Sequence, residues 1–169
     1  LPLVVKTNTA SLHYAADTQL ANNIADKWGF PITREEDKPT EGFYLLVSDN
    51  VLGLADASEK KVLPIVVDFA SPASLYRKQH GGGRKEPIVK AIGLKGNEQW
   101  HVVDATPGLG RDAFVLVSVG CMVTMIERSP IVAALLEDGI RRLAINFPEL
   151  AQRMALQHGN SAEVMQYFS

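Results

Sequence analysis

The sequence predicts an α/β fold in which parallel strands alternate with helices. The first observation is an apolar strand pattern that ends at Asp104, leads into a glycine-rich turn over residues 104–110, and continues into a helix-like segment. The second is an apolar strand at residues 122–126, followed by an acid, Glu127, seventeen positions after Gly110. A strand, a glycine-rich turn, a helix, a second strand and an acid, in this order, are typical of the first half of a Rossmann-like domain with a doubly wound sheet.

A small α+β domain is expected to precede this unit over residues 1–75. Its expected elements are a strand at residues 3–6, a helix at residues 18–28, paired strands at residues 43–48 and 51–54, and a strand at residues 62–68. Gly29 is expected to end the helix, and Asp49-Asn50 to form the hairpin turn. Pro64 predicts that the last strand lies at an edge or ends there, because proline cannot donate a hydrogen bond to a sheet.

A basic, glycine-rich segment, residues 76–99, is expected to link the two domains and to contain a short helix at residues 86–92. Between residues 75 and 95 there are six basic side chains and one acidic side chain, so this stretch has a net charge of +5 while the whole chain has −2. Three consecutive glycines there permit a backbone nest for phosphate. The candidate RNA contacts are Tyr76, Arg77, Lys78, Arg84 and Lys85. A flexible hinge with solvated lysines explains the same composition equally well.

Residues 100–169 are expected to form the N-terminal half of the Rossmann-like domain. Beyond the second strand, Ser129 predicts a helix N-cap, because Pro130 follows at the first helical position. Apolar residues then recur at helical spacing. Pro148 is expected to open a short helix, and residues 154–157 to form the third strand of the sheet.

Composition excludes several classes of protein. The chain has 169 residues, of which 46% are hydrophobic, and its net charge of −2 favours neither nucleic acid nor a membrane surface. No apolar run approaches the ~20 residues of a membrane-spanning helix, so no membrane partner is expected. Cys121 is the single cysteine and the four histidines lack paired ligand spacing, so neither a disulfide nor a metal site is expected. A reducing, cytoplasmic location fits this composition.

The glycine-rich turn has two candidate ligands. Gly108 and Gly110 let the backbone approach a nucleotide closely, and Glu127 is placed to accept hydrogen bonds from ribose hydroxyls. The run from Gly108 to Ala113 also fits the G-x-G-x-x-A pattern of NAD-dependent oxidoreductases. Asp104, however, would repel a doubly negative pyrophosphate and attract the sulfonium and ammonium groups of S-adenosylmethionine (SAM). SAM is therefore the favoured cofactor, and a nicotinamide dinucleotide is the alternative.

The end of the third strand offers two further candidates. Asn160 and Ser161 follow that strand at the same sheet edge as Asp104 and Glu127, within reach of an adenine ring. An Asx turn that binds no ligand is nearly as good an explanation. Arg128 either neutralises Glu127 or lies at the surface.

Three segments of the chain resemble the ribosomal RNA small subunit methyltransferase J family. They are residues 76–96, which include Gly81-Gly82-Gly83, residues 103–116, which include Asp-Ala-Thr-Pro-Gly-Leu-Gly-Arg-Asp, and residues 126–136, which begin Ile-Glu-Arg-Ser-Pro. The match is continuous from about Tyr76 to Leu143, and so long an ordered run is far more specific than one glycine motif. The resemblance implies a class I SAM-dependent methyltransferase that methylates the N2 amine of a guanosine in 16S rRNA, with this RNA or the small ribosomal subunit as its partner.

The resemblance also implies which side chains contact the cofactor. They are Arg111 and Asp112 after the turn, Glu127 and Arg128 after the second strand, and Asn160 and Ser161 after the third. The chain departs from the family at Pro107, where a small residue such as alanine is expected, and at Asn160, where a small hydroxyl residue is expected.

The family carries a downstream Asp-Pro-Met-aromatic-Pro motif whose acid and neighbouring carbonyl hold the target amine, and this chain lacks it. We therefore expect the catalytic residues to lie beyond Ser169 and the Rossmann-like sheet to be incomplete here. A non-catalytic RNA-binding module is a further alternative. Such a module would bind RNA through the basic segment and would not depend on Glu127.

Overall fold

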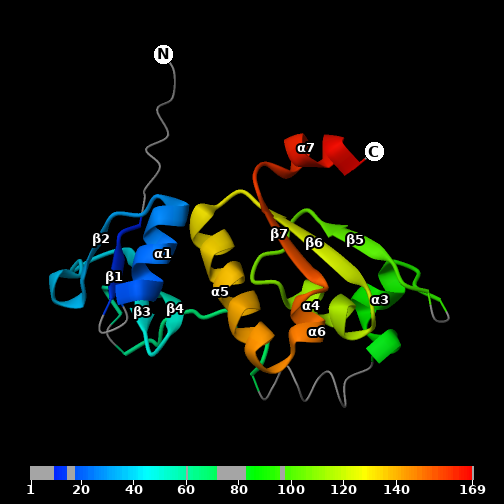
Figure 1. The fold of residues 1–169 in the computed structure, drawn as a ribbon, viewed down its shortest axis with the longest axis horizontal. Coiled ribbons are helices and arrows are strands. Elements are labelled where there is room, and N and C mark those ends of the chain that lie inside the picture. Colours follow the sequence, from blue (N-terminus) through cyan, green and yellow to red (C-terminus); the bar gives the residue numbers. More distant parts are fainter. Residues whose placement is uncertain (1–9, 15–17, 60, 72–82, 96–97, 169) are drawn as a thin grey trace. The chain divides into compact units, whose positions relative to one another are not determined.

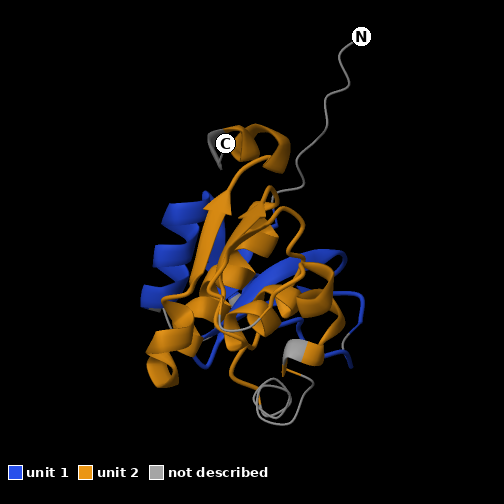
Figure 2. Ribbon diagram, turned by 90° about the vertical axis from the view of Figure 1, so that its right-hand side faces the viewer, with its two compact units in different colours: residues 1–66 blue, residues 67–169 orange. Residues whose placement is uncertain are grey.

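The computed structural model describes residues 10–14, 18–59, 61–71, 83–95 and 98–168 (Figure 1). The chain forms two compact units, Leu1–Val66 and Val67–Ser169 (Figure 2). This division falls before the domain boundary expected at residue 75, and the domain assignment stays a prediction. The strand expected at residues 3–6 and the candidate RNA contacts Tyr76, Arg77 and Lys78 lie outside the described residues.

The first unit is built on a four-stranded sheet with the order β2-β1-β3-β4. Its elements are β1 (Leu12–Tyr14), α1 (Thr18–Trp28), β2 (Ile32–Arg34), the 3-10 helix η1 (Glu35–Asp37), β3 (Phe43–Ser48) and β4 (Val51–Asp56). Strand β1 runs parallel to β2 and β3, whereas β3 and β4 are antiparallel. Helix α1 buries Ala21, Ile24 and Ala25, which lie on the apolar face that the sequence predicts.

The predicted hairpin is confirmed, and the strand predicted at residues 62–68 is wrong. Asp49 and Asn50 have positive φ values of 50° and 61°, as a two-residue hairpin turn requires. Beyond β4, a single antiparallel bridge joins Leu54 to Ile65. Pro64 offers no N–H to extend this bridge, and its side chain occupies the space beside Gly53, where an added Cβ would lie 2.8 Å from the proline Cβ.

The second unit is built on a three-stranded parallel sheet with the order β5-β6-β7. Its elements are η2 (Gly83–Lys85), α3 (Pro87–Ala91), β5 (His101–Asp104), α4 (Arg111–Ser118), β6 (Met122–Glu127), α5 (Pro130–Asn146), α6 (Pro148–Ala151), β7 (Met154–His158), α7 (Ser161–Val164) and η3 (Met165–Phe168). Helices α4 and α5 both contact β6 and β7, and right-handed crossovers place them on the same face of the sheet. The central strand β6 is buried from Val123 to Ile126, as expected for a parallel strand covered on both faces.

The predicted start of α5 is also confirmed. The Ser129 side chain accepts a hydrogen bond from the Val132 N–H at 3.4 Å, and Pro130 occupies the first helical position. Pro148 opens α6 as predicted. In the part of the chain that the structure describes, no helix has both the length and the apolar character needed to cross a membrane.

Candidate cofactor site

The parallel sheet brings the carboxyl ends of its three strands to one edge (Figure 1). Asp104 ends β5 and pairs with Met125, while Glu127 ends β6 and pairs with His158 at the end of β7. In open α/β sheets, ligands bind in the crevice outside this edge. The structure therefore places the predicted acids on neighbouring strand ends of one sheet.

The glycine-rich turn between β5 and α4 depends on left-handed backbone. Gly108 has a φ of 52° and Gly110 a φ of 74°. Gly110 is also enclosed, because an added Cβ would lie 2.8 Å from the Phe69 ring and 2.9 Å from Leu136 Cδ2. The turn accommodates the unexpected Pro107, whose carbonyl accepts a hydrogen bond from the Gly110 N–H at 2.8 Å. The N-cap residue of α4 is Gly110, which has no side chain to cap the helix, so within the described residues the N-cap leaves the first-turn N–H groups for a ligand.

Asp104 sits half-buried beside this turn and accepts a hydrogen bond from the Thr106 N–H at 3.1 Å. Burial raises the pKa of the Asp104 carboxyl above its ordinary value, the Thr106 N–H lowers it, and the charge of nearby Asp112 raises it. Within the described residues neither carboxylate forms an ion pair. A positively charged ligand group would relieve this unfavourable arrangement, and a pyrophosphate would worsen it.

Glu127 ends β6 with one carboxylate oxygen already engaged. Its Oε1 accepts a hydrogen bond from the Ser129 N–H at 2.7 Å, which fixes the carboxylate at the start of α5. Arg128 is exposed and, among the described side chains, forms no ion pair with Glu127. Its carbonyl accepts a hydrogen bond from His158 Nε2 at 3.1 Å, which joins the ends of β6 and β7. Arg128 therefore lies at the surface and does not neutralise Glu127 in this structure, and its contact with the cofactor stays a prediction.

Asn160 caps the short helix α7. Its Oδ1 accepts a hydrogen bond from the Ala162 N–H at 3.0 Å, and Ser161 is the first residue of the helix. The Asx-type interaction that the sequence allowed is therefore present. It fixes the orientation of the Asn160 side chain at the end of β7.

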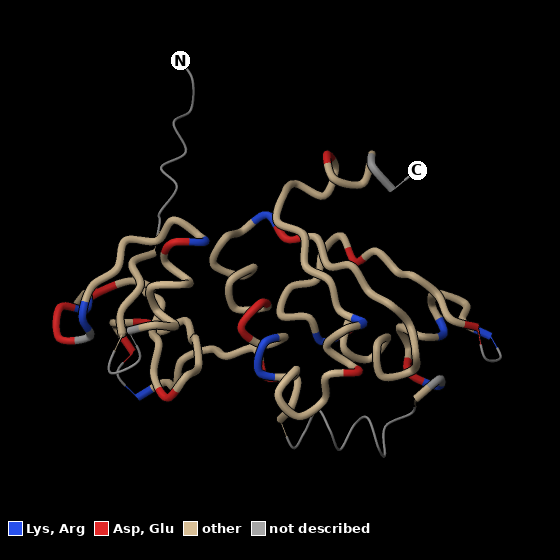
Figure 3. The backbone as a smooth tube through the Cα atoms, viewed as in Figure 1, with Lys and Arg blue, Asp and Glu red and all other residues tan. Residues whose placement is uncertain are grey.

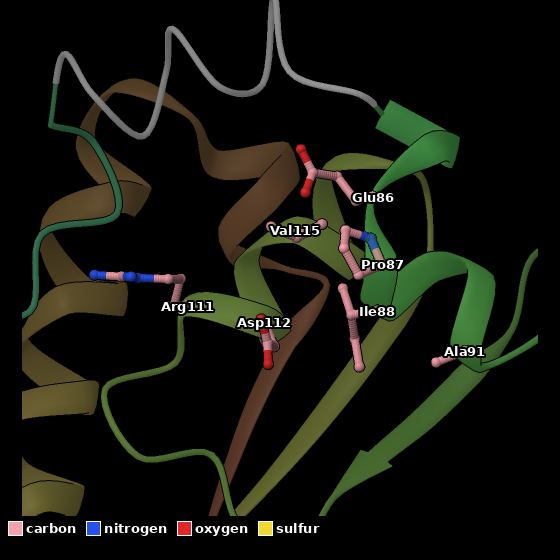
Figure 4. Close-up of a pocket in the computed structure, with 7 residues that line it drawn as sticks. All are labelled: Glu86, Pro87, Ile88, Ala91, Arg111, Asp112 and Val115. Atoms are coloured by element: carbon pink, nitrogen blue, oxygen red, sulfur yellow. The ribbon is translucent and has the colours of Figure 1, made fainter.

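Arg111 and Asp112 lie on an open cavity of about 480 Å³ between α3 and α4 (Figure 4). Its lining residues are Glu86, Pro87, Ile88, Ala91, Arg111, Asp112 and Val115. The Arg111 side chain extends away from Pro87 and Ile88, which form an apolar wall (Figure 4). Lys85 is exposed in η2 just before α3, and the Arg84 side chain lies outside the described part.

Sequence reasoning missed one feature of the site and one of the neighbouring helix α5. The aromatic ring of Phe69 packs against the glycine turn although it lies far before the motif, and no periodic pattern marks it. A buried acid, Asp138, sits on α5 next to Arg141 and Arg142, where helical spacing alone predicts only an amphipathic helix. In the ranges described here, no cluster of three or more His, Cys, Asp or Glu residues is placed to bind a metal ion.

Comparison with known proteins identifies relatives along most of the chain. A family described as "Putative SAM-dependent methyltransferase" matches residues 23–169. Two proteins named Ribosomal RNA small subunit methyltransferase J are similar: that of Alteromonas mediterranea is 76% identical over 169 residues, and that of Pseudoalteromonas atlantica is 49% identical over 149 residues. These alignments cover 100% and 86% of this chain but 64% and 56% of the relatives. The chain therefore spans less than two thirds of the length of these relatives.

A solved structure gives the same assignment. The crystal structure of a SAM-dependent methyltransferase from Neisseria gonorrhoeae matches with a TM-score of 0.74 and 36% sequence identity, covering 94% of this chain and 64% of that one. The Rossmann-like α/β fold predicted from the glycine turn is thus confirmed, and the NAD-dependent oxidoreductase alternative loses its support. The chain belongs to the SAM-dependent methyltransferase family, and its resemblance to ribosomal RNA small subunit methyltransferase J proteins extends over its full length.

Proposed function

We propose that this chain binds SAM at the carboxyl edge of the β5-β6-β7 sheet. We further propose that it is part of an enzyme that methylates the N2 amine of a guanosine in 16S rRNA. The observation that supports SAM as the cofactor is the pair of acids Asp104, which is half-buried, and Asp112, which lies near it. Both are close to the N-terminus of α4, whose N-cap residue is a glycine. The rRNA half is supported by the names of the relatives, which are ribosomal RNA methyltransferases of the small subunit.

Each strand end has a separate role in this proposal. Asp104 attracts the positive groups of the cofactor, and the turn at Gly108 and Gly110 admits it closely. Glu127 accepts hydrogen bonds from the ribose hydroxyls, while its contact with the Ser129 N–H keeps it oriented. Arg111 and Asp112, together with Asn160 and Ser161, complete the proposed contacts at the start of α4 and the end of β7.

SAM supplies an electrophilic methyl group when it is bound. The N2 amine of guanine is a weak nucleophile, because its lone pair is delocalised into the ring. The contribution of this chain is therefore to position the cofactor so that an unstacked base can approach it in line. Unstacking a base typically costs a few kcal/mol, which contacts to the RNA must offset.

Asp104→Asn is expected to weaken cofactor binding while it stabilises the cofactor-free protein. Loss of the charge is expected to lower the affinity for SAM about tenfold or more, as for a hydrogen bond to a charged group. The raised pKa of Asp104 means that its charged form opposes folding at neutral pH, so the variant is expected to melt at a higher temperature at pH 7. This advantage should disappear as the pH falls below about 4, where the unfolded carboxyl also becomes protonated.

Calorimetric titration with SAM, S-adenosylhomocysteine and NAD, together with melting curves from pH 3 to 7, measures both effects. Asp26→Asn removes the same charge from an exposed position in α1 and should change neither. Unchanged SAM affinity in the Asp104 variant, or binding of NAD alone by the wild-type protein, would contradict the proposal.

The basic segment is the proposed RNA contact. Replacing Arg77, Lys78, Arg84 and Lys85 with alanine should reduce the salt dependence of binding to an rRNA fragment, by about 0.7–0.9 in logarithmic slope for each phosphate that the variant no longer neutralises. A matched variant removes four positive charges from the first unit, at Lys27, Arg34, Lys38 and Lys61. Equal slopes for both variants and the wild-type protein would reject this role.

A further inference from the structure

The segment Val67-Asp68-Phe69 crosses α5 at a glycine. Val67 and Phe69 are both buried. A Cβ on Gly139 would lie 2.6 Å from Val67 Cγ1 and 2.9 Å from the Val67 carbonyl oxygen, so only glycine leaves room for this crossing. We call residues 67–69 the strap. Its path over α5 fixes where the Phe69 ring can lie.

The Phe69 ring forms one wall of the glycine turn. Its Cζ and Cε1 atoms would lie 2.8 Å and 3.0 Å from a Cβ on Gly110, and Leu136 closes the same space from α5. The ring also stacks on Phe114 of α4, with ring centroids 5.5 Å apart and an interplanar angle of 20°. Phe69 therefore contacts both the last residue of the turn and the helix that the turn begins.

A charged side chain on α5 holds the strap from outside. The Arg142 guanidinium donates to the Val67 carbonyl and, at 3.4 Å, to Asp68 Oδ1. Its Nε atom donates to Asp138 Oδ2 at 2.9 Å, so the guanidinium is oriented from both sides. The strap is thus fixed to α5 both by polar contacts and by the close approach at Gly139.

We propose that Phe69 is a positioning residue for the cofactor: its ring holds the Gly110 turn in the conformation that receives SAM. This inference rests on the proposed cofactor site and adds a residue that lies outside the glycine motif. Gly110 has no side chain and is conformationally free, so the side-chain contacts that hold it must come from other residues. A rigid ring held by the strap and by Phe114 supplies them, because packed aromatic side chains resist displacement.

Two substitutions change the packing under the turn in opposite ways, one by leaving a gap and one by adding an atom. Phe69→Leu keeps an apolar side chain but leaves a gap under the turn, whereas Phe69→Tyr adds a hydroxyl to the ring atom nearest Gly110. Both variants are expected to bind S-adenosylhomocysteine about tenfold more weakly than the wild-type protein. In the cofactor-free protein, both should speed hydrogen exchange at the Gly110 amide, which donates to the Pro107 carbonyl at 2.8 Å. Phe30→Leu makes the same change at a buried phenylalanine of the first unit and should alter neither measurement.

The outcomes separate this inference from the proposed function. A wild-type protein that binds neither SAM nor S-adenosylhomocysteine would overturn both. A wild-type protein that binds them, with Phe69→Leu binding equally tightly and the Gly110 amide equally protected, would overturn only the role of Phe69. A loss of affinity that Phe30→Leu reproduces would mean that lower stability alone causes the effect, and it would also overturn that role.

Discussion

Gly110→Ala is expected to lower the free energy of unfolding by about 2–5 kcal/mol. A left-handed backbone costs an alanine about 1–2 kcal/mol, and forcing a methyl group into a packed space costs about 1–3 kcal/mol more. The space is filled, because the added Cβ would lie 2.8 Å from the Phe69 ring and 2.9 Å from Leu136. Relieving these contacts requires the Phe69 ring, Leu136 or the turn itself to move, so SAM binding is also expected to weaken.

Gly108→Ala is the matched control for this substitution. Gly108 also has a positive φ, of 52°, but an added Cβ would meet nothing within 4 Å. Its expected cost is therefore the backbone strain alone, about 1–2 kcal/mol. Urea unfolding of both variants measures the difference. Equal losses would mean that the enclosure by Phe69 and Leu136 does not contribute.

Asp138→Ala is expected to cost about 2–4 kcal/mol of stability. The Asp138 side chain is 2% exposed and accepts hydrogen bonds from Arg141 at 2.8 Å and from Arg142 at 2.9 Å. Figure 3 shows acidic and basic positions adjoining each other along α5. Removing one partner of a buried ion pair typically costs about 3–5 kcal/mol. The lower range applies here because the two guanidinium groups, 34% and 15% exposed, retain access to water.

A surface pair in the first unit provides the comparison. Arg34 and Glu36 lie 3.6 Å apart with side chains 72% and 70% exposed, so Glu36→Ala should change stability by less than about 0.5 kcal/mol. Chemical denaturation of the two variants side by side measures the contrast. A loss under about 1 kcal/mol for Asp138→Ala would show that the arginines find other partners and that the strap does not depend on this acid.

The sequence predicted the second unit well because its signals are local. Ser129-Pro130 marks the start of a helix by chemistry confined to two residues. The apolar run of β6 is long enough to be recognised as a strand from the sequence. The strands β1 and β2 were not predicted, because three residues do not establish a period. The incorrect strand at residues 62–68 has the composition of a strand, but Pro64 limits its pairing to one bridge.

Within the candidate site, too, the residues with local sequence signals were predicted and those that depend on tertiary packing were not. The acids at the strand ends and the glycines of the turn were predictable, because each follows its strand directly in the sequence. Phe69 was not, because its contact with Gly110 depends on how α5 and the strap pack in three dimensions. The Asp138 cluster was missed for a related reason. Helical spacing brings the acid and the arginines together, but their large effect on stability depends on burial, which only the tertiary structure shows.

The strap has a practical consequence for anyone who wishes to produce the nucleotide-binding half alone. A recombinant fragment whose start is chosen from the sequence motifs would begin near residue 76. It would contain every glycine and acid of the site. It would lack Phe69, so that Phe114 would lose its stacked ring, Gly110 would lose one wall of its enclosure, and Arg142 would lose Asp68. Such a fragment would have the complete glycine motif without the Phe69 ring that packs against it. A fragment that begins at Val67 keeps the motif and the strap together.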